Sequence, residues 1–406
     1  MEIDLKKYNL KWLPMLLLSI SAGSLAFVFF RKELLFVTFS LFAILFFIRG
    51  LYKTDLIRFF QLVVLFISLL LVNYNYASVE QSIQKLLSNI LIFACSIFAA
   101  LYYSREENKS QFINHLRLIL KVVLIHSIIN FLIYPSVELN LIEISNERYD
   151  CLTYNYLFYY LGETHLVNFF SFEIARNQGI FWEPGILQIF MNLLLFIEAF
   201  IFKRRGFIFW LTIFSIISTF STTGLLVMFI QLSLYFFTAF KQNVYVSALV
   251  LVVIGLTYFI TAANVQNKIF GDGQVSFQAR LFDLVQPLYI LADSPLTGVG
   301  LDDEQYVSTR QKTSYSLNLD VIDFTNRKKG STNSVTFFLA AAGLPFFIIV
   351  FYCLYNQQFV LEKRLWFFIF MVISLMTEPL LLRPFFLTFV MSGAIHFFDK
   401  FRWKEY

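Results

Sequence analysis

Apolar runs recur along this chain and restrict its fold more strongly than any other feature of the sequence. A membrane-crossing helix needs about 20 consecutive, mostly apolar residues, and stretches of this kind appear again and again before the C-terminus. Of the 406 residues, 58% are hydrophobic and 15% are charged, and the mean hydropathy is +0.68. A water-soluble fold cannot bury so much apolar surface. We therefore expect an all-α polytopic membrane protein.

The apolar runs between charged breaks predict about twelve transmembrane helices. The expected segments are 13–30, 34–48, 59–77, 86–103, 118–135, 181–202, 207–220, 223–240, 244–263, 333–354, 365–377 and 385–398. The first is long for the apolar part of a signal peptide and lacks a clear small-residue cleavage site, so we expect it to stay as a membrane helix.

Lys and Arg residues predict the orientation of this plan. Nineteen of them fall in the short loops and tails of one side, and four fall in the short loops of the other side: Arg31, Lys32, Lys85 and Arg383. The basic side of a membrane protein is cytoplasmic, so both termini are expected in the cytoplasm. The two long segments then become outer loops, where functional residues are common.

This plan divides the chain into five consecutive regions. A five-helix membrane region at 1–135 precedes a first long outer loop at 136–178. A four-helix membrane region at 179–263 is followed by a second long outer loop at 264–331, and a three-helix membrane region at 332–406 ends the chain.

The remaining composition argues against several classes of partner. Cys95, Cys151 and Cys353 are spread over apolar runs and one loop, so we expect neither a disulfide nor a metal site. The net charge of +5 follows from the orienting Lys and Arg residues, which argues against nucleic acid as a partner. His165 is the one histidine in an outer loop, and we expect it to be solvated rather than catalytic.

A charged, helix-breaking segment at 176–185, Arg-Asn-Gln-Gly-Ile-Phe-Trp-Glu-Pro-Gly, leads directly into an apolar run. A carboxylate at a membrane boundary is costly, which makes Glu183 a candidate for function, and burial beside Trp182 would raise its pKa. Alternatively, Trp182 belongs to an interfacial aromatic belt, Pro184 starts a helix, and Glu183 interacts with the positive helix end.

The second long loop holds Arg280 and Asp283, followed by an acid-rich, glycine-interrupted turn that includes Asp302. Arg280 suits a diphosphate because its planar guanidinium donates two parallel hydrogen bonds to phosphate oxygens. Alternatively, Arg280 and Asp283 form a local surface ion pair. Turn geometry alone explains Gly298 and Gly300.

Two further outer turns carry polar residues. The first is Ser221-Thr222-Thr223-Gly224, where small residues favour close helix packing and the hydroxyl of Thr223 is available to a ligand. The second contains Glu378 and Arg383, each beside a proline. They form an ion pair in one interpretation, whereas in the other Arg383 contacts phosphate or sugar.

The order of these motifs resembles the bacterial O-antigen polymerase and ligase superfamily, including the Wzy-type polysaccharide polymerases. The resemblance covers most of the chain and rests on the helix plan, the 176–185 segment, the Ser-Thr-Thr-Gly turn, residues 280–300, and Ser331-Thr332-Asn333-Ser334 leading to Gly343. It implies a C-type, metal-independent membrane glycosyltransferase without a cofactor. Ligases of this group carry a histidine where this chain has Thr332, which favours polymerisation.

The resemblance further implies transfer of a growing glycan from a polyprenyl-diphosphate carrier to a second lipid-linked repeat unit at the outer face. The expected catalytic residues are Glu183 and Asp302, and the expected substrate-binding residues are Arg176, Arg280, Arg383, Glu378, Asn333 and Thr223. The product would be O-antigen, capsule or exopolysaccharide, and a chain-length regulator and a flippase are expected as partners. Ligation to another acceptor and flipping of lipid-linked oligosaccharide are the alternatives.

Overall fold

The structure, a computed structural model, describes residues 10–48, 52–146, 149–161, 166–169, 172–239, 255, 274–312 and 330–402. The chain forms two compact units, each built from segments that are distant in sequence. The first unit comprises Met1–Leu16, Gly23–Arg31 and Ile113–Asn267. The second unit comprises Leu17–Ala22, Lys32–Phe112 and Lys268–Tyr406. The predicted helix at 244–263 lies almost entirely outside the described residues, and so does His165.

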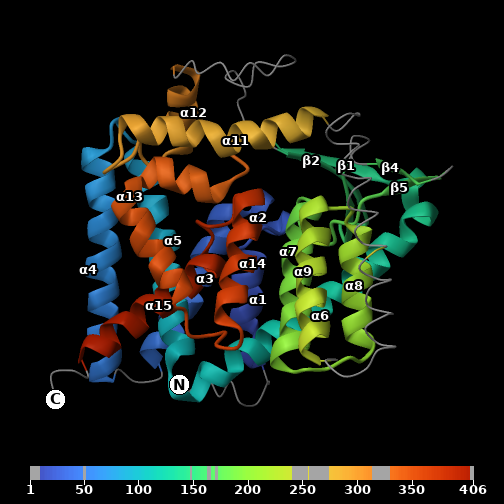
Figure 1. The fold of residues 1–406 in the computed structure, drawn as a ribbon, viewed down its shortest axis with the longest axis horizontal. Helices are drawn as coiled ribbons and strands as arrows, with labels where there is room; N and C mark the ends of the chain where they lie inside the picture. The colour runs from blue at the N-terminus through green and yellow to red at the C-terminus, as the bar shows by residue number, and fades with distance from the viewer. Residues whose placement is uncertain are drawn as a thin grey trace. The chain divides into compact units, whose positions relative to one another are not determined.

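The first unit combines helices with short strands (Figure 1). Its helices are α2 (Leu25–Phe29), most of α6 (Glu106–Val137), η2 (Glu138–Asn140), α7 (Pro184–Phe196), the π-helical turn η4 (Ile197–Ile201), α8 (Phe207–Ser218) and α9 (Thr222–Ala239). Its strands are β1 (Ile142–Asn146), β2 (Tyr149–Tyr154), β3 (Phe158–Tyr160), β4 (Leu166–Phe169) and β5 (Phe172–Ala175). The short η1 (Leu10–Trp12) and α1 (Leu13–Ile20) precede α2.

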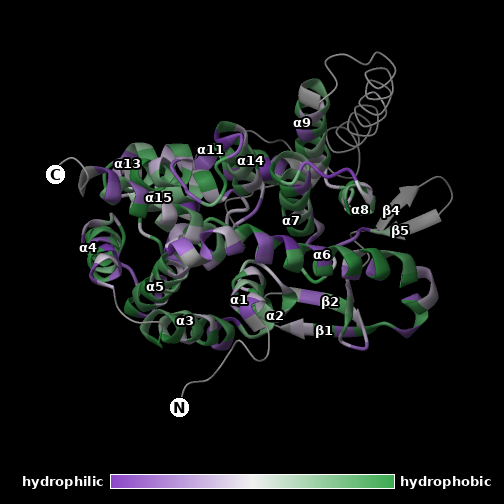
Figure 2. Cartoon of the chain, turned by 90° about the horizontal axis from the view of Figure 1, so that it is seen from below, coloured by the Kyte–Doolittle hydropathy of each residue, from purple (hydrophilic) through white to green (hydrophobic). Residues whose placement is uncertain are grey.

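The second unit is helical in its described part. Its helices are α3 (Arg31–Ile48), α4 (Lys53–Tyr76), α5 (Ile83–Ser104), α11 (Gln274–Asp293), α12 (Asp303–Lys312), α13 (Ser334–Tyr355), α14 (Arg364–Thr377) and α15 (Pro384–Arg402). Figure 1 shows α4 and α5 running side by side, with α11 lying across the end of this bundle. Figure 2 shows hydrophobic residues along most of α3 and α5.

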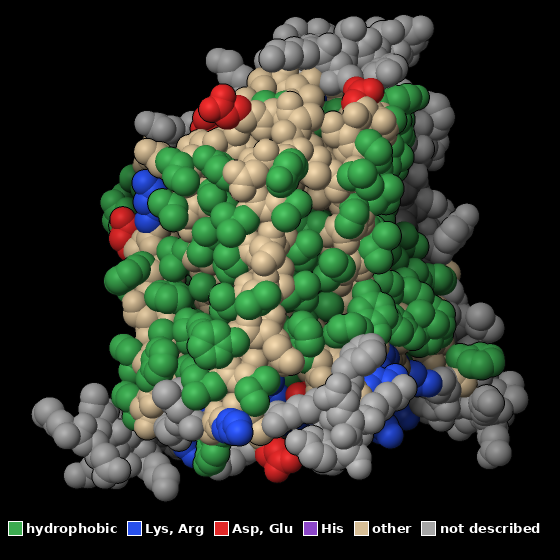
Figure 3. Space-filling model, turned by 90° about the vertical axis from the view of Figure 1, so that its left-hand side faces the viewer, with side chains coloured by type: hydrophobic (Ala, Val, Ile, Leu, Met, Phe, Trp, Pro, Cys, Tyr) green, Lys and Arg blue, Asp and Glu red, His purple; other side chains and the backbone are tan. Residues whose placement is uncertain are grey.

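Five helical segments are long and apolar enough to cross a membrane: Lys53–Tyr76, Ile83–Ser104, Asn108–Asn140, Pro184–Ile201 and Ser334–Tyr355. The outward face of α4 has the composition that lipid contact requires, since Phe60 and Val64 are 61% and 64% exposed. The face of the molecule that includes α4 is covered by hydrophobic side chains in its middle, with charged side chains towards its ends (Figure 3). The chain is therefore a membrane protein.

Ten of the twelve predicted apolar segments coincide with helices, the segment at 244–263 lies almost entirely outside the described residues, and the first segment is interrupted. The chain leaves α1 after Ile20 and re-enters a helix at Leu25, because residues 23–25 pair with the 180–182 segment as extended backbone. The N–H of Leu25 donates to the carbonyl of Ile180 at 2.9 Å, and the N–H of Trp182 donates to the carbonyl of Gly23 at 3.3 Å. The expectation of one continuous helix at 13–30 is therefore wrong.

The expectation of an all-α fold also needs correction, because the first long loop forms β-structure. Strands β1, β2 and β3 make an antiparallel sheet, and β4 and β5 make a hairpin. In β2, Cys151 and Thr153 are buried while Asp150 is exposed, as the period of two in a strand requires. Tyr134 of α6 packs with Tyr160 and Ala175 into a small core. The fold is mostly helical with a small β-layer.

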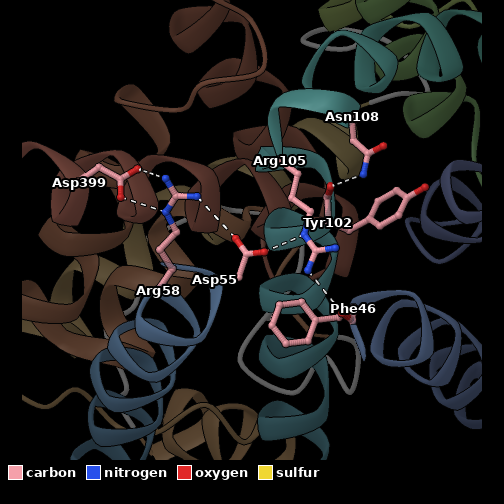
Figure 4. A network of polar contacts seen from close by, with 7 residues as sticks. All are labelled: Phe46, Asp55, Arg58, Tyr102, Arg105, Asn108 and Asp399. Carbon is pink, nitrogen blue, oxygen red and sulfur yellow. Dashed lines mark hydrogen bonds and ion pairs between the residues drawn. The ribbon is translucent and has the colours of Figure 1, made fainter. Parts of the chain in front are cut away.

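A buried charge network connects three helices of the second unit (Figure 4). Asp55 of α4 accepts a 2.8 Å hydrogen bond from Nε of Arg105, and both side chains are less than 10% exposed. Arg58 lies 3.7 Å from Asp55 and donates two hydrogen bonds, of 3.0 and 2.8 Å, to Asp399 of α15. Arg105 also stacks over the ring of Phe46. The network joins the beginning of α4, the residue after α5 and the end of α15.

Candidate functional site

Three elements of the second unit meet at the beginning of α13: helix α11, helix α12 and residues 330–333. Oδ2 of Asp283 accepts hydrogen bonds from the backbone N–H and the hydroxyl of Thr332, each at 2.8 Å. Nη1 of Arg310 lies 3.9 Å from Oδ1 of the same carboxylate. Asp283 and Arg310 are both almost completely buried, so their charges interact in a region of low polarity. The pair holds α11, α12 and the start of α13 together.

The surroundings of this pair are partly apolar. Ile290, Val299, Tyr306 and Ala340 form a buried cluster that links α11, α12 and α13. Burial raises the pKa of the Tyr306 phenol above its ordinary value, Asp283 raises it further, and Arg310 acts in the opposite direction. Tyr306 therefore stays neutral at physiological pH.

Helix α13 bends sharply at Gly343. Backbone carbonyls next to this bend bind the glycine-containing turn before α12. Gly343 has φ +79°, and Pro345 lacks an N–H group, so the helix cannot continue straight. The carbonyls of Ala340 and Ala341, just before the bend, accept hydrogen bonds from the N–H groups of Val299 and Gly300, at 3.0 and 2.9 Å. Figure 1 shows the bend beneath α11. The glycine-containing turn thus donates backbone hydrogen bonds to the bent helix, in agreement with the predicted turn role of Gly298 and Gly300.

Asp302 is buried and has backbone partners on both carboxylate oxygens. Oδ1 accepts from the N–H of Glu304 at 3.0 Å at the start of α12, and Oδ2 accepts from the N–H of Ser82 at 3.2 Å just before α5. These are capping contacts, which stabilise two helix beginnings. They account for Asp302 structurally, and its expected catalytic role stays a prediction.

Asn333 and Glu378 are linked through Ser334, which follows Asn333 and whose side-chain hydroxyl contacts the backbone of Glu378. Oδ1 of Asn333 caps α13 by accepting from the N–H groups of Val335 and Thr336, at 3.0 and 3.1 Å. The hydroxyl of Ser334 lies 2.8 Å from the carbonyl oxygen of Glu378. Arg383, half-buried, is the residue immediately before α15 in the same turn. The sequence-predicted residues Asn333, Glu378 and Arg383 are therefore brought to one end of the second unit.

Arg280 lies three residues before Asp283 on α11 and is half-buried. The expected local pair between them does not form, because the Asp283 carboxylate faces Thr332 and Arg310 instead. Within the described residues, Arg280 has no hydrogen bond or ion pair. Its guanidinium is thus a charge without a partner beside the Asp283 region.

In the first unit, the 176–179 segment is tied to the end of α8. Nε of Arg176 donates to the carbonyl of Thr219 at 3.0 Å. Nδ2 of Asn177 donates to the hydroxyl of Ser218 at 2.9 Å, and its backbone N–H donates to the carbonyl of the same residue. These bonds position the half-buried Arg176 side chain on a buried polar turn.

The structure contradicts the expected burial of Glu183. Phe181 pairs with Ser24 as extended backbone, and Glu183 itself has extended dihedral angles of φ −146° and ψ 148°. Because neighbouring side chains of an extended segment point in opposite directions, Trp182 is buried and Glu183 is exposed. Pro184 occupies the first turn of α7, as expected for a helix start.

Thr223 lies half-buried in the first turn of α9. Its neighbour Gly224 packs against α7 so closely that a Cβ at that position would lie 2.8 Å from Cβ of Gln188. Nδ2 of Asn192 donates to the carbonyl of Gly224 at 3.2 Å. The expected packing role of the Ser-Thr-Thr-Gly turn is therefore confirmed, and ligand contact by Thr223 stays a prediction.

The sequence interpretation missed three buried polar features. Arg310 was not singled out, although an arginine following an acid-rich turn is a usable signal. Glu198 interrupts an apolar run, and its buried carboxylate receives Nε and Nη2 of Arg117 at 2.7 and 3.0 Å. The side chain of Gln178 is completely buried, and neither of its polar atoms has a hydrogen-bond partner.

The described residues thus contain two groups of predicted site residues, one in each unit. Arg176, Glu183 and Thr223 belong to the first unit, whereas Arg280, Asp302, Asn333, Glu378 and Arg383 belong to the second. Among the residues that the structure describes, no three acidic, histidine or cysteine side chains are arranged to hold a metal ion.

Comparison with known proteins yields no match: no protein-family model, no curated protein and no solved structure is similar to this chain.

Proposed function

We propose that this chain is a membrane glycosyltransferase that polymerises polyprenyl-diphosphate-linked oligosaccharide repeat units. The observation that carries the proposal is Arg280, a half-buried arginine without a hydrogen bond or ion pair in the described part of the chain. A partly buried guanidinium is costly unless an anion joins it, and a diphosphate fits its planar donor geometry. The motif order described for the sequence supports glycan transfer as the chemistry.

The proposed architecture is that of the sequence plan, with about twelve transmembrane helices in the bacterial inner membrane and both termini in the cytoplasm. Glycosyl transfer then takes place at the outer face. Helix α11 supports this arrangement, because it lies across the end of the helical bundle of its unit instead of running parallel to α4 (Figure 1). A helix in that position suits the membrane surface, where a lipid-linked diphosphate is found.

In the proposed reaction, a hydroxyl of the acceptor repeat unit attacks the anomeric carbon of the donor glycan. The bond between this carbon and the diphosphate oxygen breaks, and the polyprenyl diphosphate leaves with the electron pair. Arg280 stabilises the negative charge on the leaving group, assisted by Arg383 of the same unit. Arg176 and Glu183 of the first unit stay the sequence's candidates for a second phosphate contact and for the base that accepts the acceptor proton.

Ligation to another acceptor is the second candidate, with the same bond chemistry. Thr332 counts against it, because a threonine hydroxyl is not a general base at neutral pH and this hydroxyl donates to Asp283. A flippase, the third candidate, would need charges along a path through the membrane. No observation on the described residues favours such a path over the cluster at the start of α13.

Deleting the gene distinguishes the three candidates. Cells without the polymerase should accumulate single lipid-linked repeat units on the outer leaflet. Unattached polymer would indicate a ligase, and repeat units confined to the cytoplasmic leaflet would indicate a flippase. The readout is a glycan ladder combined with mass analysis of extracted lipid-linked oligosaccharide.

Substitution of Arg280 tests the observation behind the proposal. We expect Arg280→Lys to shorten the glycan ladder at normal expression, because an ammonium group lacks the planar two-point contact with a diphosphate. Arg364→Lys is a matched control: Arg364 is also half-buried, starts α14 and is predicted to face the cytoplasm. Full chain length with Arg280→Lys would refute the role of Arg280.

Glu183→Gln tests the proposed base, because it keeps the size of the side chain and removes its basicity. The variant should insert normally and accumulate single repeat units. Glu143→Gln, at an exposed position on β1, provides the control for losing one carboxylate from the predicted outer side. Normal polymer from Glu183→Gln would remove Glu183 from the reaction.

A further inference from the structure

A group of positively charged side chains surrounds the C-terminal end of α7 in the first unit. We call Arg117, Lys121, Lys203, Arg204 and Arg205 the basic patch. Lys203, Arg204 and Arg205 are exposed, whereas Arg117 and Lys121 of α6 are half-buried. The patch lies outside the groups of predicted site residues, and the proposed reaction does not use it.

A π-helical turn at Ile197–Ile201 brings the one nearby carboxylate, Glu198, to the patch. Arg117 occupies both of its oxygens, at 2.7 and 3.0 Å, and Glu198 is almost completely buried. The backbone carbonyl of Glu198 accepts the N–H of Arg204 at 2.9 Å, which holds the 202–205 turn against the buried pair. Glu198, the one acid of the described segment 184–239, is therefore already neutralised by Arg117.

No salt bridge joins Lys121, Lys203 or Arg204 to an acid among the described residues, and Arg205 donates a hydrogen bond to the hydroxyl of Tyr235. Lys121 interacts electrostatically with Arg117, Glu198 and Arg204, so these groups lie within range of one another. The ring of Phe202 has the guanidinium carbons of Arg117 and Arg204 at 4.3 and 5.9 Å from its centre. Between residues 176 and 239 the only acids are Glu183 and Glu198, which lie at opposite ends of α7. The patch thus has a positive charge that the neighbouring chain does not balance.

Exposed aromatic residues follow the patch directly. Helix α8 begins one residue after Gly206, and its Phe207 and Trp210 side chains are 76% and 52% exposed. Tryptophan beside Lys and Arg is typical of the boundary between lipid headgroups and acyl chains. The basic turn is followed directly by exposed aromatic side chains, and the positive charge therefore lies next to an apolar surface.

We propose that the basic patch binds the phosphate of an anionic phospholipid headgroup, with the acyl chains of that lipid lying along Phe207 and Trp210. Lys121 and Arg204 contact the phosphate, since Arg117 is engaged by Glu198. Charge complementarity selects an anionic lipid over a zwitterionic one, whose positive headgroup would face the same cations. This inference does not depend on the proposed transferase activity.

The test uses the purified full-length protein in mild detergent, with retained lipid measured by native mass spectrometry. Phosphatidylglycerol, phosphatidylcholine and inorganic phosphate are added separately, and the melting temperature is recorded for each. We expect retention and stabilisation with phosphatidylglycerol only. In the Lys121→Gln/Arg204→Gln variant, affinity should fall by about thirtyfold, from roughly 1 kcal/mol per cation.

A second basic turn of this chain supplies a matched control. Lys363 has nearly the same left-handed φ as Lys203, 50° against 52°, and Arg364 and the exposed Trp366 follow it. Glu362 precedes this turn and balances its charge locally. Lys363→Gln/Arg364→Gln should therefore keep the bound phosphatidylglycerol.

Three results would overturn the proposal. The first is equal phosphatidylglycerol binding by the Lys121/Arg204 variant and the unaltered protein. The second is equal stabilisation by phosphatidylcholine, and the third is an equal effect of inorganic phosphate, which would indicate a general anion site. If the double variant is not monodisperse, Arg204→Gln alone replaces it, because Arg204 is exposed at a turn.

Discussion

Replacing Asp55 by alanine should destabilise the second unit strongly, because Asp55 is the central member of the buried charge network (Figure 4). The substitution removes the 2.8 Å partner of Arg105, whose side chain is 9% exposed. Arg105 would retain its full charge, since arginine does not lose its proton in proteins. The loss leaves a buried guanidinium without its carboxylate, with the carbonyl of Phe46, at 3.4 Å, among its remaining contacts.

The expected cost follows from this burial. Removing one member of a buried ion pair typically costs about 3–5 kcal/mol, because the other charge stays desolvated. The pair of Arg58 and Asp399 provides an internal comparison, with side chains 25% and 28% exposed. An exposed pair contributes about 0–1 kcal/mol, so Asp399→Ala should have a small effect. Asp55→Asn should fall between these values because it keeps a hydrogen-bond acceptor.

The measurement is unfolding of the purified protein in mixed micelles with increasing dodecyl sulfate, followed by circular dichroism. The free energy of unfolding should decrease in the order Asp399→Ala, Asp55→Asn, Asp55→Ala. Adding Arg105→Met to Asp55→Ala should restore part of the loss, since it removes the unpaired charge. Equal effects of Asp55→Ala and Asp399→Ala would show that burial does not govern the strength of this network.

Three further predictions concern other parts of the fold. Gly343→Ala should destabilise the protein by more than about 2 kcal/mol, because φ is +79° and the new Cβ would lie 2.3 Å from the carbonyl oxygen of Leu296; Gly206→Ala, with open space around it, should be nearly neutral. The cysteine of Asn140→Cys should react with a membrane-impermeant maleimide from outside, whereas the native cysteines should not react. All native cysteines are buried, and burial, followed by the charge of Asp150, raises the pKa of Cys151 to about 12. Protection of this cysteine until lysis would overturn the orientation. Finally, the raised pKa of Tyr306 stabilises the fold below pH about 10, and this stability is lost as the pH rises through the folded pKa; unfolding at high pH should therefore be steeper in the unaltered protein than in Tyr306→Phe.

The helices could be predicted because the length of an apolar run directly reflects the membrane requirement. Helix α4 begins at Lys53 and α5 ends at Ser104, each within six residues of its predicted bounds of 59–77 and 86–103. The strands of the first long loop were missed, since each contains only three to six residues. In β2 the buried positions include the polar Thr153 beside the less buried Leu152, so the alternation in burial is not an alternation in hydropathy that the sequence could reveal.

The candidate site was predictable only in part, because polar contacts between distant segments have no local signature. Arg280 and Asp283 are three residues apart, a spacing that favours a local ion pair on a helix. The folded chain instead places Asp283 beside Thr332 and Arg310, which are 49 and 27 residues away. Glu183 shows the opposite error: its neighbour Trp182 is buried as expected, but extended backbone directs the two side chains to opposite sides.

The interval between Asn333 and Gly343, which contributed to the family resemblance, has a structural explanation in this chain. Asn333 caps the first half of α13, and Gly343 ends that half because its φ is positive. The nine residues between them form about two and a half helical turns. Asn333 and Gly343 are therefore required by the backbone, whatever substrate the protein binds.

Hydrogen bonds within the second unit reduce the number of its polar groups that can bind a substrate. Oδ1 of Asn333 accepts hydrogen bonds from two backbone N–H groups. Each carboxylate oxygen of Asp302 also accepts a hydrogen bond from a backbone N–H group. The Nδ2 group of Asn333 forms no hydrogen bond with described residues, so it is the part of that side chain left for a substrate. Arg280 has no hydrogen bond or ion pair with the described residues and lies one helical turn from the carboxylate that anchors Thr332. A negatively charged substrate at the start of α13 would therefore be held mainly by Arg280, with the Asp283 and Arg310 pair as its rigid support.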